Sequence, residues 1–379
     1  MKIIHMSDLH LGKRLNEISL IEDQEYILKK ILTAIKEEAP GAVIIAGDVY
    51  DKAVPSAEAV ALFDDFLFNL TELGTEIFVI SGNHDSAERI AFGSRMLDKS
   101  GIHMSPVFTG SIEATRIEDE YGTVAIYMLP FIKPANVRRF CEDRELKSYT
   151  EAIDYVISGI EKRDDERNIL VAHQFVTGSS RSESEEISVG GTDNVDASVF
   201  SGFDYTALGH LHKPQNCTSE RIRYSGSPLK YSFSESGDEK SLTLIELGEK
   251  GEIEIRTIAL NPLRDMVELR GSYEKLTMKS FYEGTGYRDD YVHITLTDEE
   301  DVPEAMNKLR VIYRNLMKLD YDNARTRASG KIESAADTEL KTPFELFSDF
   351  YVLQNNAEMD AEKADFIERL IEEIREGKI

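Results

Sequence analysis

The sequence predicts an α/β fold built from layers of strands and helices. Short apolar segments of strand length alternate with amphipathic helical patterns through the first third of the chain. Each of these apolar segments ends in a polar loop. From about Ser241 the pattern changes to the strict apolar and polar alternation of paired strands. Alternating strands and helices are the sequence pattern of α/β proteins, which establishes the class.

The expected elements of the first domain follow from these patterns. They are a strand over 2–6, a helix over 20–38, a strand over 42–46, a helix over 57–73, strands over 76–80, 124–129, 169–172 and 205–208, and a closing hairpin over 241–260. The first helix is amphipathic, with Ile27, Ile31 and Ile35 on one stripe. We place this domain at residues 1–262.

A smaller second unit begins after Pro262. Its expected order is strand, helix, strand, helix, over 265–270, 273–282, 290–297 and 303–316, which makes a small α/β domain at 263–328. A polar segment suited to a linker follows at 329–342. Amphipathic helical patterns then fill residues 343–379.

The composition excludes several classes of protein. With 44 Lys and Arg against 70 Asp and Glu, the formal charge is −26, so a globally basic nucleic-acid-binding surface is excluded. The longest segment without a charged residue, 168–180, is shorter than the roughly 18 residues of a membrane span. Asp8 interrupts the apolar segment that a secretory leader would need. The only cysteines, Cys141 and Cys217, are too far apart in sequence for a CxxC motif. We therefore expect a cytoplasmic protein.

Polar motifs follow the predicted strands at the points where those strands end. In order they are Asp8-Leu9-His10, Gly47-Asp48-Val49-Tyr50-Asp51, Gly82-Asn83-His84-Asp85, His173 and Gly209-His210-Leu211-His212. Groups at the carboxyl ends of strands in α/β sheets meet at one edge, so these side chains are expected to share a site. Each motif alone is common in ordinary turns. Together they contain five of the eight histidines and offer carboxylate, imidazole and amide ligands suited to Mn²⁺, Fe or Zn²⁺.

This ordered set resembles the calcineurin-like, two-metal phosphoesterases. The resemblance implies a sandwich of two sheets flanked by helices, and two divalent cations, for which we expect Mn²⁺. It also implies cleavage of a phosphoester by metal-activated hydroxide. One cation would be held by Asp8, His10, Asp48 and His212, and the other by Asp48, Asn83, His173 and His210, with Asp48 as the bridge.

Two further residues of the third motif have expected catalytic roles. His84 would face the scissile phosphate, polarising it or protonating the leaving oxygen, without binding a metal. Asp85 would orient the His84 ring by a hydrogen bond, or would cap a helix that starts near Ser86.

Longer segments resemble the bacterial SbcD nucleases, a narrower family. They are IIHMSDLHLGK at the start, SVGGTDNVDASVFSGFDYTALGHLHKPQ, RYSGSPLKYSFSE and ELFSDFYVLQN. The resemblance implies an ATP-dependent double-strand DNA exonuclease that is also a single-strand and hairpin endonuclease in DNA repair and recombination. Its partner would be an SbcC-like, SMC-type ATPase, present in two copies in a heterotetramer. Residues 263–328 would be the capping domain, and Asp51 stands where archaeal and eukaryotic relatives carry His.

The resemblance also implies two interfaces. The C-terminal helices would dock on the ATPase coiled coil through Phe347, Phe350, Phe366 and Leu370, or else would cover the chain's own core. A homodimer would form through Phe63, Phe66, Ile90 and Phe92, unless the helix over 57–73 is simply buried. Two other functions stay open at this point: a phosphatase or cyclic-nucleotide phosphodiesterase of the same superfamily, and a non-catalytic scaffold for the ATPase.

Overall fold

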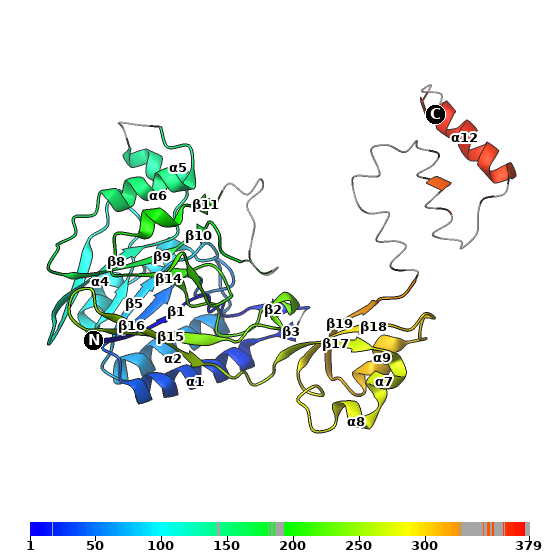
Figure 1. Ribbon diagram of the computed structural model, residues 1–379, viewed down its shortest axis with the longest axis horizontal. Helices are drawn as coiled ribbons and strands as arrows, with labels where there is room; N and C mark the ends of the chain where they lie inside the picture. The colour runs from blue at the N-terminus through cyan, green and yellow to red at the C-terminus, as the bar shows by residue number, and fades with distance from the viewer. Residues whose placement is uncertain are drawn as a thin grey trace. The chain divides into compact units, whose positions relative to one another are not determined.

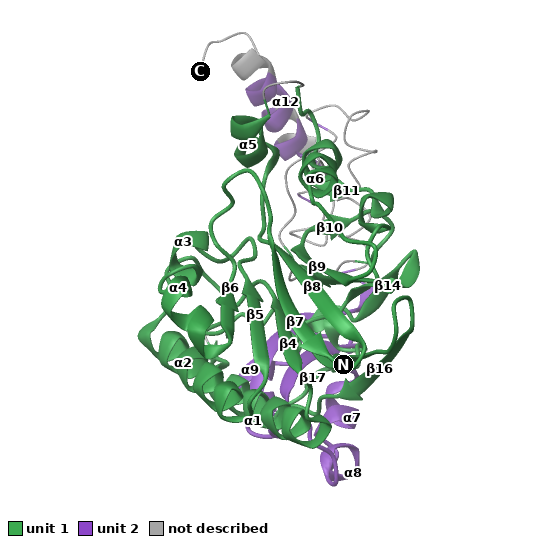
Figure 2. Cartoon of the chain, turned by 90° about the vertical axis from the view of Figure 1, so that its left-hand side faces the viewer, with its two compact units in different colours: residues 1–267 green, residues 268–379 purple. Residues whose placement is uncertain are grey.

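The protein is described from a computed structural model. The structure describes residues 1–379 except 17, 142–144, 181, 183–184, 186–192, 325, 327–343, 345–346, 349–350, 352–358, 360 and 376–379. The chain divides into two compact units, Met1–Val267 and Glu268–Ile379 (Figure 2).

The first unit contains two six-stranded sheets. One sheet has the order β16-β15-β1-β4-β5-β6, in which β1, β4, β5 and β6 run parallel and β15 and β16 are antiparallel. Its strands are β1 (Lys2–Met6), β4 (Ala42–Ala46), β5 (Glu76–Ile80), β6 (Ile102–Met104), β15 (Ser241–Leu247) and β16 (Ile253–Ala259). Every residue of β4 is buried, as expected of a central parallel strand covered on both faces.

The second sheet has the order β13-β14-β12-β9-β8-β7, with antiparallel strands only at its edges. Its strands are β7 (Ala114–Asp119), β8 (Gly122–Leu129), β9 (Arg167–His173), β12 (Tyr205–Gly209), β13 (Gln215–Cys217) and β14 (Ser219–Tyr224). Shorter strands form two separate pairs: β2 (Arg14–Leu15) with β3 (Ile18–Ser19), and β10 (Phe175–Val176) with β11 (Asn194–Val195).

The two sheets pack face to face between helical layers. Their facing side chains form one core, to which the first sheet contributes Ile44 and Phe78 and the second Ile126 and Val171. Figure 1 shows α1 (Ile21–Glu38) and α2 (Ala57–Glu72) on one side of the sheets, and α5 (Pro134–Val137) and α6 (Tyr149–Ser158) on the other. The predicted α/β class is thus confirmed, and the layers are helix, sheet, sheet, helix.

The two long helices, α1 and α2, end in different ways. Ser56 caps α2 by accepting a hydrogen bond from the Ala59 N–H, and Ala39 ends α1 in the left-handed conformation. Short helices lie in the connections: α3 (Ala87–Ile90), α4 (Ser94–Leu97) and single 3₁₀ turns at Asp98–Ser100, Arg138–Phe140, Ala197–Phe200 and Phe233–Glu235. No described helix is long and apolar enough to cross a membrane.

The second unit departs from its predicted element order. Its first strand, β17 (Met266–Gly271), begins two residues before the boundary between the units. The elements that follow are α7 (Tyr273–Thr277), α8 (Lys279–Tyr282), β18 (Tyr291–Leu296), α9 (Ala305–Arg310), β19 (Asn315–Tyr321) and α12 (Ala361–Arg375). The helix predicted over 303–316 ends at Arg310, and β19, which was not predicted, pairs parallel to β18. The chain turns because Tyr313 is fully buried and donates a hydrogen bond to the Leu276 carbonyl. The predicted linker at 329–342 lies outside the described residues, as does much of the first part of the helical patterns predicted over 343–379.

Candidate metal centre

The predicted motifs meet at the carboxyl ends of strands from both sheets. Asp8 and His10 follow β1, Asp48 follows β4, and Asn83 and His84 follow β5, all in the first sheet. His173 ends β9, and His210 and His212 follow β12, in the second sheet. The site therefore lies where the two sheets meet, and it draws on residues from widely separated parts of the chain.

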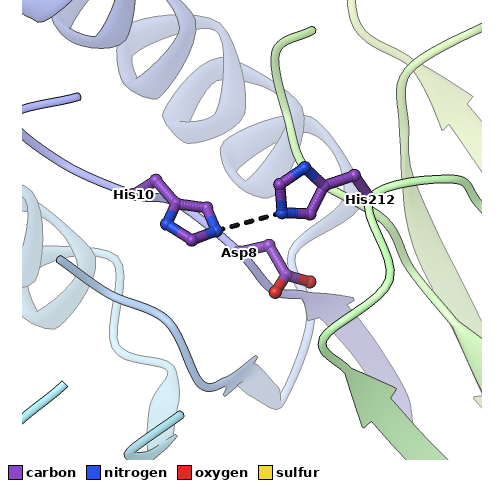
Figure 3. Close-up of side chains that lie close together, drawn as sticks. All are labelled: Asp8, His10 and His212. Carbon is purple, nitrogen blue, oxygen red and sulfur yellow. Dashed lines mark hydrogen bonds between the residues drawn. The ribbon is translucent and has the colours of Figure 1, made fainter. Parts of the chain in front are cut away.

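The first group of side chains is Asp8, His10 and His212 (Figure 3). All three are almost completely buried, with at most 1% of each residue exposed. The Nε2 atoms of His10 and His212 lie 3.0 Å apart and point toward one another. The Asp8 carboxylate accepts hydrogen bonds from the Ser7 hydroxyl and the His210 N–H, which fix its orientation. Two ring nitrogens and a carboxylate that converge in this way suit one divalent cation.

The second group is Asn83, His173 and His210. The Asn83 Oδ1 atom lies 3.0 Å from His173 Nε2 and 2.9 Å from His210 Nδ1. His173 is fully buried, and its other ring nitrogen, Nδ1, lies 2.8 Å from the Ala46 carbonyl oxygen. Because a carbonyl only accepts, Nδ1 carries the hydrogen, and Nε2 faces the group.

Asp48 lies between the two groups. Its Oδ2 atom is 3.6 Å from His10 Nε2 and 3.4 Å from His173 Nε2. Its Oδ1 atom accepts the His84 N–H at 2.9 Å, so the backbone holds the carboxylate in place. One carboxylate oxygen facing ligands of both groups is the arrangement that a bridging ligand requires.

The electrostatics of the site favour a cation. Burial opposes ionisation of Asp48, but the nearby imidazoles of His173 and His10 outweigh it and hold the pKa of this carboxyl well below its usual range. Burial alone would lower the pKa of His173, but the Asp48 carboxylate outweighs it and raises this pKa to about 9. Burial raises the pKa of Asp8 to about 6 and lowers the pKa of His10 well below its usual range. Positive charge is therefore stabilised beside Asp48, and a cation that binds there displaces the proton.

The backbone at the site is held in an unusual conformation. Asp8, His10, Asp48 and His210 have positive φ angles, of 55°, 43°, 49° and 109° respectively. Residues other than glycine seldom adopt this region, and such conformations concentrate at functional sites, where surrounding structure imposes them. Four of the seven predicted ligands share this feature.

His84 is placed beside the two groups rather than within them. Its Nδ1 atom donates a hydrogen bond to the Asp51 carbonyl at 3.1 Å, and its Nε2 atom lies 4.0 Å from Asp48 Oδ2. About 15% of the side chain is exposed, so Nε2 can meet a ligand that enters the site from solvent. The backbone carbonyl of Asp51 thus contacts His84, while its carboxylate forms an ion pair with Lys13, with 2.8 Å between Oδ1 and Nζ.

Asp85 has a different role from both roles expected of it. Its carboxylate accepts three backbone hydrogen bonds, from Gly82, Val49 and Tyr50, at 2.9 to 3.1 Å. It thereby ties the loop after β5 to the loop after β4. The His84 ring is oriented by the Asp51 carbonyl, and the cap of α3 is Ser86, which accepts from the Arg89 N–H. The predictions that Asp85 orients His84 or caps the helix are therefore wrong.

Several buried polar residues that support the site escaped prediction. Glu235 and Lys240 lie behind His212, and Glu185 accepts its backbone N–H. The Tyr231 hydroxyl donates to the Leu9 carbonyl, and its ring packs against the rings of His10 and His212. Glu235 and Tyr231 belong to the segment RYSGSPLKYSFSE, which the sequence marked as distinctive without showing what its residues contact.

The residues present fit two divalent cations of intermediate hardness. Three sets of side chains with ligand atoms within 4.8 Å of one another occur among the described residues: Asp8 with His10 and His212, His10 with Asp48 and His84, and Asp8 with Asp48 and His173. His84 thus comes within reach of the ligand atoms, although its ring is fixed by Asp51. The donors are nitrogen and oxygen without thiolate, which admits Mn²⁺, Fe²⁺ and Zn²⁺.

The residues predicted for the dimer interface are mostly internal. Phe63, Phe66 and Ile90 are 4%, 2% and 5% exposed, so they pack inside their own chain and are not available on its surface. Phe92 is 81% exposed. Burial of one face of α2 against the sheet, the competing interpretation, accounts for the first two. The exposed apolar residues of α2 are instead Val60 and Phe68.

The residues predicted to dock on a partner lie in the C-terminal segment. Phe347 and Phe366 are 38% and 59% exposed, and Leu370 is partly buried. Phe350 lies outside the described residues. Phe347 and Tyr351, together with Phe366 and Ile367 of α12, line a local cavity of about 470 Å³.

Comparison with known proteins identifies the family. Residues 1–214 match the calcineurin-like phosphoesterase family, and residues 262–355 match the type 5 capsule protein repressor C-terminal domain family. The chain is 36% identical over 323 residues to the SbcD subunit of the nuclease SbcCD from Staphylococcus saprophyticus, a match that covers 84% of each chain. It is 31% identical over 388 residues to the SbcD subunit of the nuclease SbcCD from Staphylococcus epidermidis, a match that covers 100% of each.

Similar solved structures include GAP50, the anchor in the inner membrane complex of Plasmodium, with a TM-score of 0.42, 12% identity, and coverage of 69% of this chain and 85% of that one. A dimetal phosphatase from Danio rerio has a TM-score of 0.39, 11% identity, and coverage of 69% and 99%. The sequence matches, which extend over both units, decide the assignment: this chain belongs to the calcineurin-like phosphoesterases and, within them, to the SbcD family of nuclease subunits.

Proposed function

We propose that this chain is the nuclease subunit of an SbcCD-type complex, which hydrolyses phosphodiester bonds of DNA. It acts as an ATP-stimulated exonuclease on double strands and as an endonuclease on single strands and hairpins. The observation that carries the proposal is the position of Asp48 Oδ2, which faces His10 Nε2 on one side and His173 Nε2 on the other. The relatives that are named as the SbcD subunit of the nuclease SbcCD support the choice of DNA as substrate.

Seven side chains would hold two divalent cations. Asp8, His10, Asp48 and His212 form one set, and Asp48 with Asn83, His173 and His210 forms the other. When bound, two Mn²⁺ ions would supply the positive charge that acidifies water and offsets the charge gained by the phosphate during attack.

The protein's own groups prepare this chemistry. Ser7 and the His210 N–H fix Asp8, while the His84 N–H fixes Asp48, so the carboxylates need no reorganisation when the substrate enters. The Asp51 carbonyl holds His84 by Nδ1 and leaves Nε2 as the atom that can donate a proton to the departing oxygen. His84 is thereby a catalytic residue, and Asp85 is a positioning residue that ties the two loops.

The chain requires a partner for nucleotide hydrolysis. Its sequence contains no G-x-x-x-x-G-K-[ST] motif, so ATP must be hydrolysed by another protein. An SbcC-like ATPase, two copies per heterotetramer, fits this need. The apolar residues of α12, Phe366 and Leu370, with Phe347 before them, form the surface that docks on the ATPase coiled coil. The net charge of −26 also makes affinity for DNA weak unless the partner contributes.

The remaining parts of the assembly follow from the same proposal. The small sheet of β17, β18 and β19 belongs to residues 263–328, the capping domain of this proposal, which follows the rotation of DNA and helps to set the direction of exonuclease cleavage. Two copies of the chain form a homodimer through the exposed apolar residues of α2 and of the segment after α3. A DNA substrate places the complex in the cytoplasm, at the nucleoid.

The decisive experiment measures metal content and DNA cleavage in the same samples. The purified chain with Mn²⁺ should nick single-stranded DNA, and addition of the ATPase and ATP should extend cleavage to blocked ends and hairpins. His84→Ala should abolish cleavage while the Mn²⁺ content stays unchanged. Cleavage of p-nitrophenyl phosphate without cleavage of DNA would instead indicate a phosphatase.

Deletion of residues 343–379 tests the docking surface. The shortened chain should lose co-purification with the ATPase and keep basal Mn²⁺-dependent cleavage of single strands. Retained ATPase binding would show that the partner docks elsewhere.

A further inference from the structure

A buried Lys–Glu pair lies behind the predicted metal ligand His212. Glu235, at the end of the 3₁₀ turn Phe233–Glu235, is completely buried. Its Oε1 atom lies 3.2 Å from His212 Nδ1, and its Oε2 atom accepts a hydrogen bond from Lys240 Nζ at 2.6 Å. Only 5% of Lys240 is exposed. Both charged groups have therefore been removed from water beside a single imidazole.

Lys240 contacts the same histidine that Glu235 contacts. Its Nζ atom donates to the His212 carbonyl oxygen at 2.8 Å and to Ser227 Oγ at 3.1 Å. With the bond to Glu235, these contacts use the three hydrogens of the ammonium group. An ion pair removed from water is costly unless its hydrogen bonds are complete, and here they are complete for Lys240.

A second carboxylate secures the backbone of His212 on its other side. Glu185 Oε1 accepts the His212 N–H at 2.7 Å, and Glu185 Oε2 accepts the Ser182 N–H at the same distance. The Ser182 hydroxyl in turn donates to Glu235 Oε1 at 3.3 Å. His212 is thus held at its N–H, at its carbonyl and at Nδ1.

These contacts determine which ring nitrogen of His212 carries the hydrogen. An ionised carboxylate only accepts, so His212 Nδ1 donates to Glu235, and the lone pair of the neutral ring lies on Nε2. That Nε2 atom points at His10 Nε2, 3.0 Å away (Figure 3). The buried His10 Nδ1 has no hydrogen-bond partner among the described residues, and the nearest carboxylate oxygen, Asp51 Oδ1, lies 3.9 Å away. Of the two rings, His212 is therefore the one whose outer nitrogen is hydrogen-bonded to a carboxylate.

We propose that Glu235 is a positioning residue for metal binding, which fixes the tautomer and ring orientation of His212, and that Lys240 holds Glu235 in place. The inference rests on the proposed function in one respect, the role of His212 as a ligand. It adds a specific outer carboxylate to one of the two cation sites. Loss of an outer partner of this kind lowers metal affinity by about 10- to 100-fold.

Two double variants of the full chain isolate the hydrogen bond from the ion pair. Glu235→Gln with Lys240→Met removes both charges but keeps an acceptor oxygen for His212 Nδ1. Glu235→Leu with Lys240→Met removes both charges and the acceptor. Paired replacement of a buried ion pair by neutral groups preserves folding better than loss of one partner. Mn²⁺ binding is followed by electron paramagnetic resonance of free Mn²⁺ during titration of the metal-free protein.

We expect the Leu double variant to bind one of its Mn²⁺ ions at least about tenfold more weakly than the Gln double variant, with the other ion unaffected. Equal affinities in the two double variants would overturn the proposal and leave Glu235 a structural residue. Glu235→Ala alone should show the same weakened site, together with a lowered melting temperature.

A buried ion pair elsewhere provides the matched control. Arg167 and Asp119 are 2% and 8% exposed and pair at the opposite end of β9 from His173. Asp119→Asn should lower the melting temperature without changing Mn²⁺ affinity. If Asp119→Asn lost as much Mn²⁺ affinity as the Leu double variant, the proposal would also be overturned, because the loss would then reflect general destabilisation of the protein.

The outcomes separate this inference from the nuclease proposal. A chain that binds two Mn²⁺ ions but cuts no DNA would refute the nuclease activity and leave the comparison of the double variants decisive for Glu235. A chain that cuts DNA while both double variants bind Mn²⁺ equally well would refute the role of Glu235 and leave the nuclease intact.

Discussion

The His173 ring joins the two sheets of the nuclease unit: its Nδ1 atom donates a hydrogen bond to the Ala46 carbonyl at 2.8 Å. Ala46 ends β4 in the first sheet, and His173 ends β9 in the second. The same ring presents Nε2 to Asp48, 3.4 Å away. A residue that packs the sheets together therefore also orients a ligand, so the metal centre and the sheet packing depend on one another.

Replacement of His173 should remove one cation and leave the other. His173→Ala removes the nitrogen that faces Asn83 and Asp48, while Asp8, His10 and His212 remain. We expect the Mn²⁺ content to fall from two ions per chain to one, measured by elemental analysis after gel filtration. His103→Ala, which alters a histidine of β6 outside the site, should retain two. Two ions in both variants would contradict the assignment of His173.

Gly209 should tolerate no side chain, because the sheets approach too closely. A Cβ atom at this position would overlap the Ala46 carbonyl oxygen and lie 2.8 Å from His173 Nδ1. Because the Ala46 carbonyl oxygen belongs to the backbone of β4, the overlap can be removed only if the two sheets separate. We expect Gly209→Ala to lower the free energy of unfolding by about 3 kcal/mol.

Gly237 provides the control for this substitution. A Cβ atom there meets nothing within 4 Å, so Gly237→Ala should change the free energy of unfolding by less than about 0.5 kcal/mol. Urea denaturation of both variants makes the comparison. Equal stabilities would mean that the sheets are not in close contact at Ala46.

The sequence predicted which side chains would lie together because local pattern and topology agree there. Strands over 2–6 and 42–46 have the expected limits, and the rule that ligands gather at the carboxyl ends of strands brought Asp8, Asp48 and His173 together. When a short polar loop follows a fully apolar strand, the polar side chains have few alternative positions in the fold. The order of the motifs along the chain therefore carried information about their position in space.

The errors arose where a distant contact decides the outcome. Residues 315–321 form a strand because β18 offers them a parallel partner, which no local pattern reveals. Asp85 binds backbone N–H groups of a loop 35 positions away instead of its neighbour His84. Glu235 and Lys240 look like ordinary surface charges in the sequence, yet burial behind His212 makes them part of the site.

A buried histidine next to the site should make stability depend on pH. His5 Nε2 donates to the Leu208 carbonyl at 3.2 Å, and its Nδ1 accepts from the Tyr205 hydroxyl at 3.0 Å, which requires a neutral ring. Burial and then the charge of Arg223 lower the pKa of His5 from 6.5 to about 3. Below pH 6.5 the unfolded chain binds a proton that the folded chain refuses, so the contribution of His5 to stability declines as the pH falls from about 6.5 to about 3.

The variant His5→Gln should remove this dependence. Its amide can donate to Leu208 and accept from Tyr205 without titrating. Relative to the variant, the unaltered chain should lose about 2 kcal/mol between about pH 6.5 and about pH 5.0, at roughly 1.36 kcal/mol per pH unit. Urea denaturation in the presence of a chelator gives the difference, free of any contribution from bound metal. If the stability curves of the two proteins ran parallel over this pH range, His5 would not be the source of the pH dependence.

The exposed apolar residues near α2 should form the dimer contact. Val60 and Phe68, 45% and 63% exposed, are separated by about two helical turns and lie on the solvent side of α2. Phe63 and Phe66 occupy its buried side. Phe92 and Met96, which follow the next strand, are 81% and 71% exposed. Large apolar side chains that are exposed to this degree are typical of an interface between proteins.

Charges placed on this surface should separate the two copies. Phe68→Glu combined with Phe92→Glu would require two carboxylates to be buried in the interface, so we expect a monomer by analytical ultracentrifugation where the unaltered chain is a dimer. Val311→Glu is the control, since Val311 is 78% exposed but lies in the second unit. Basal cleavage of single strands should survive in the monomer, because all seven proposed ligands come from one chain. A dimer that persists in the Phe68 and Phe92 double variant would place the contact elsewhere on the chain.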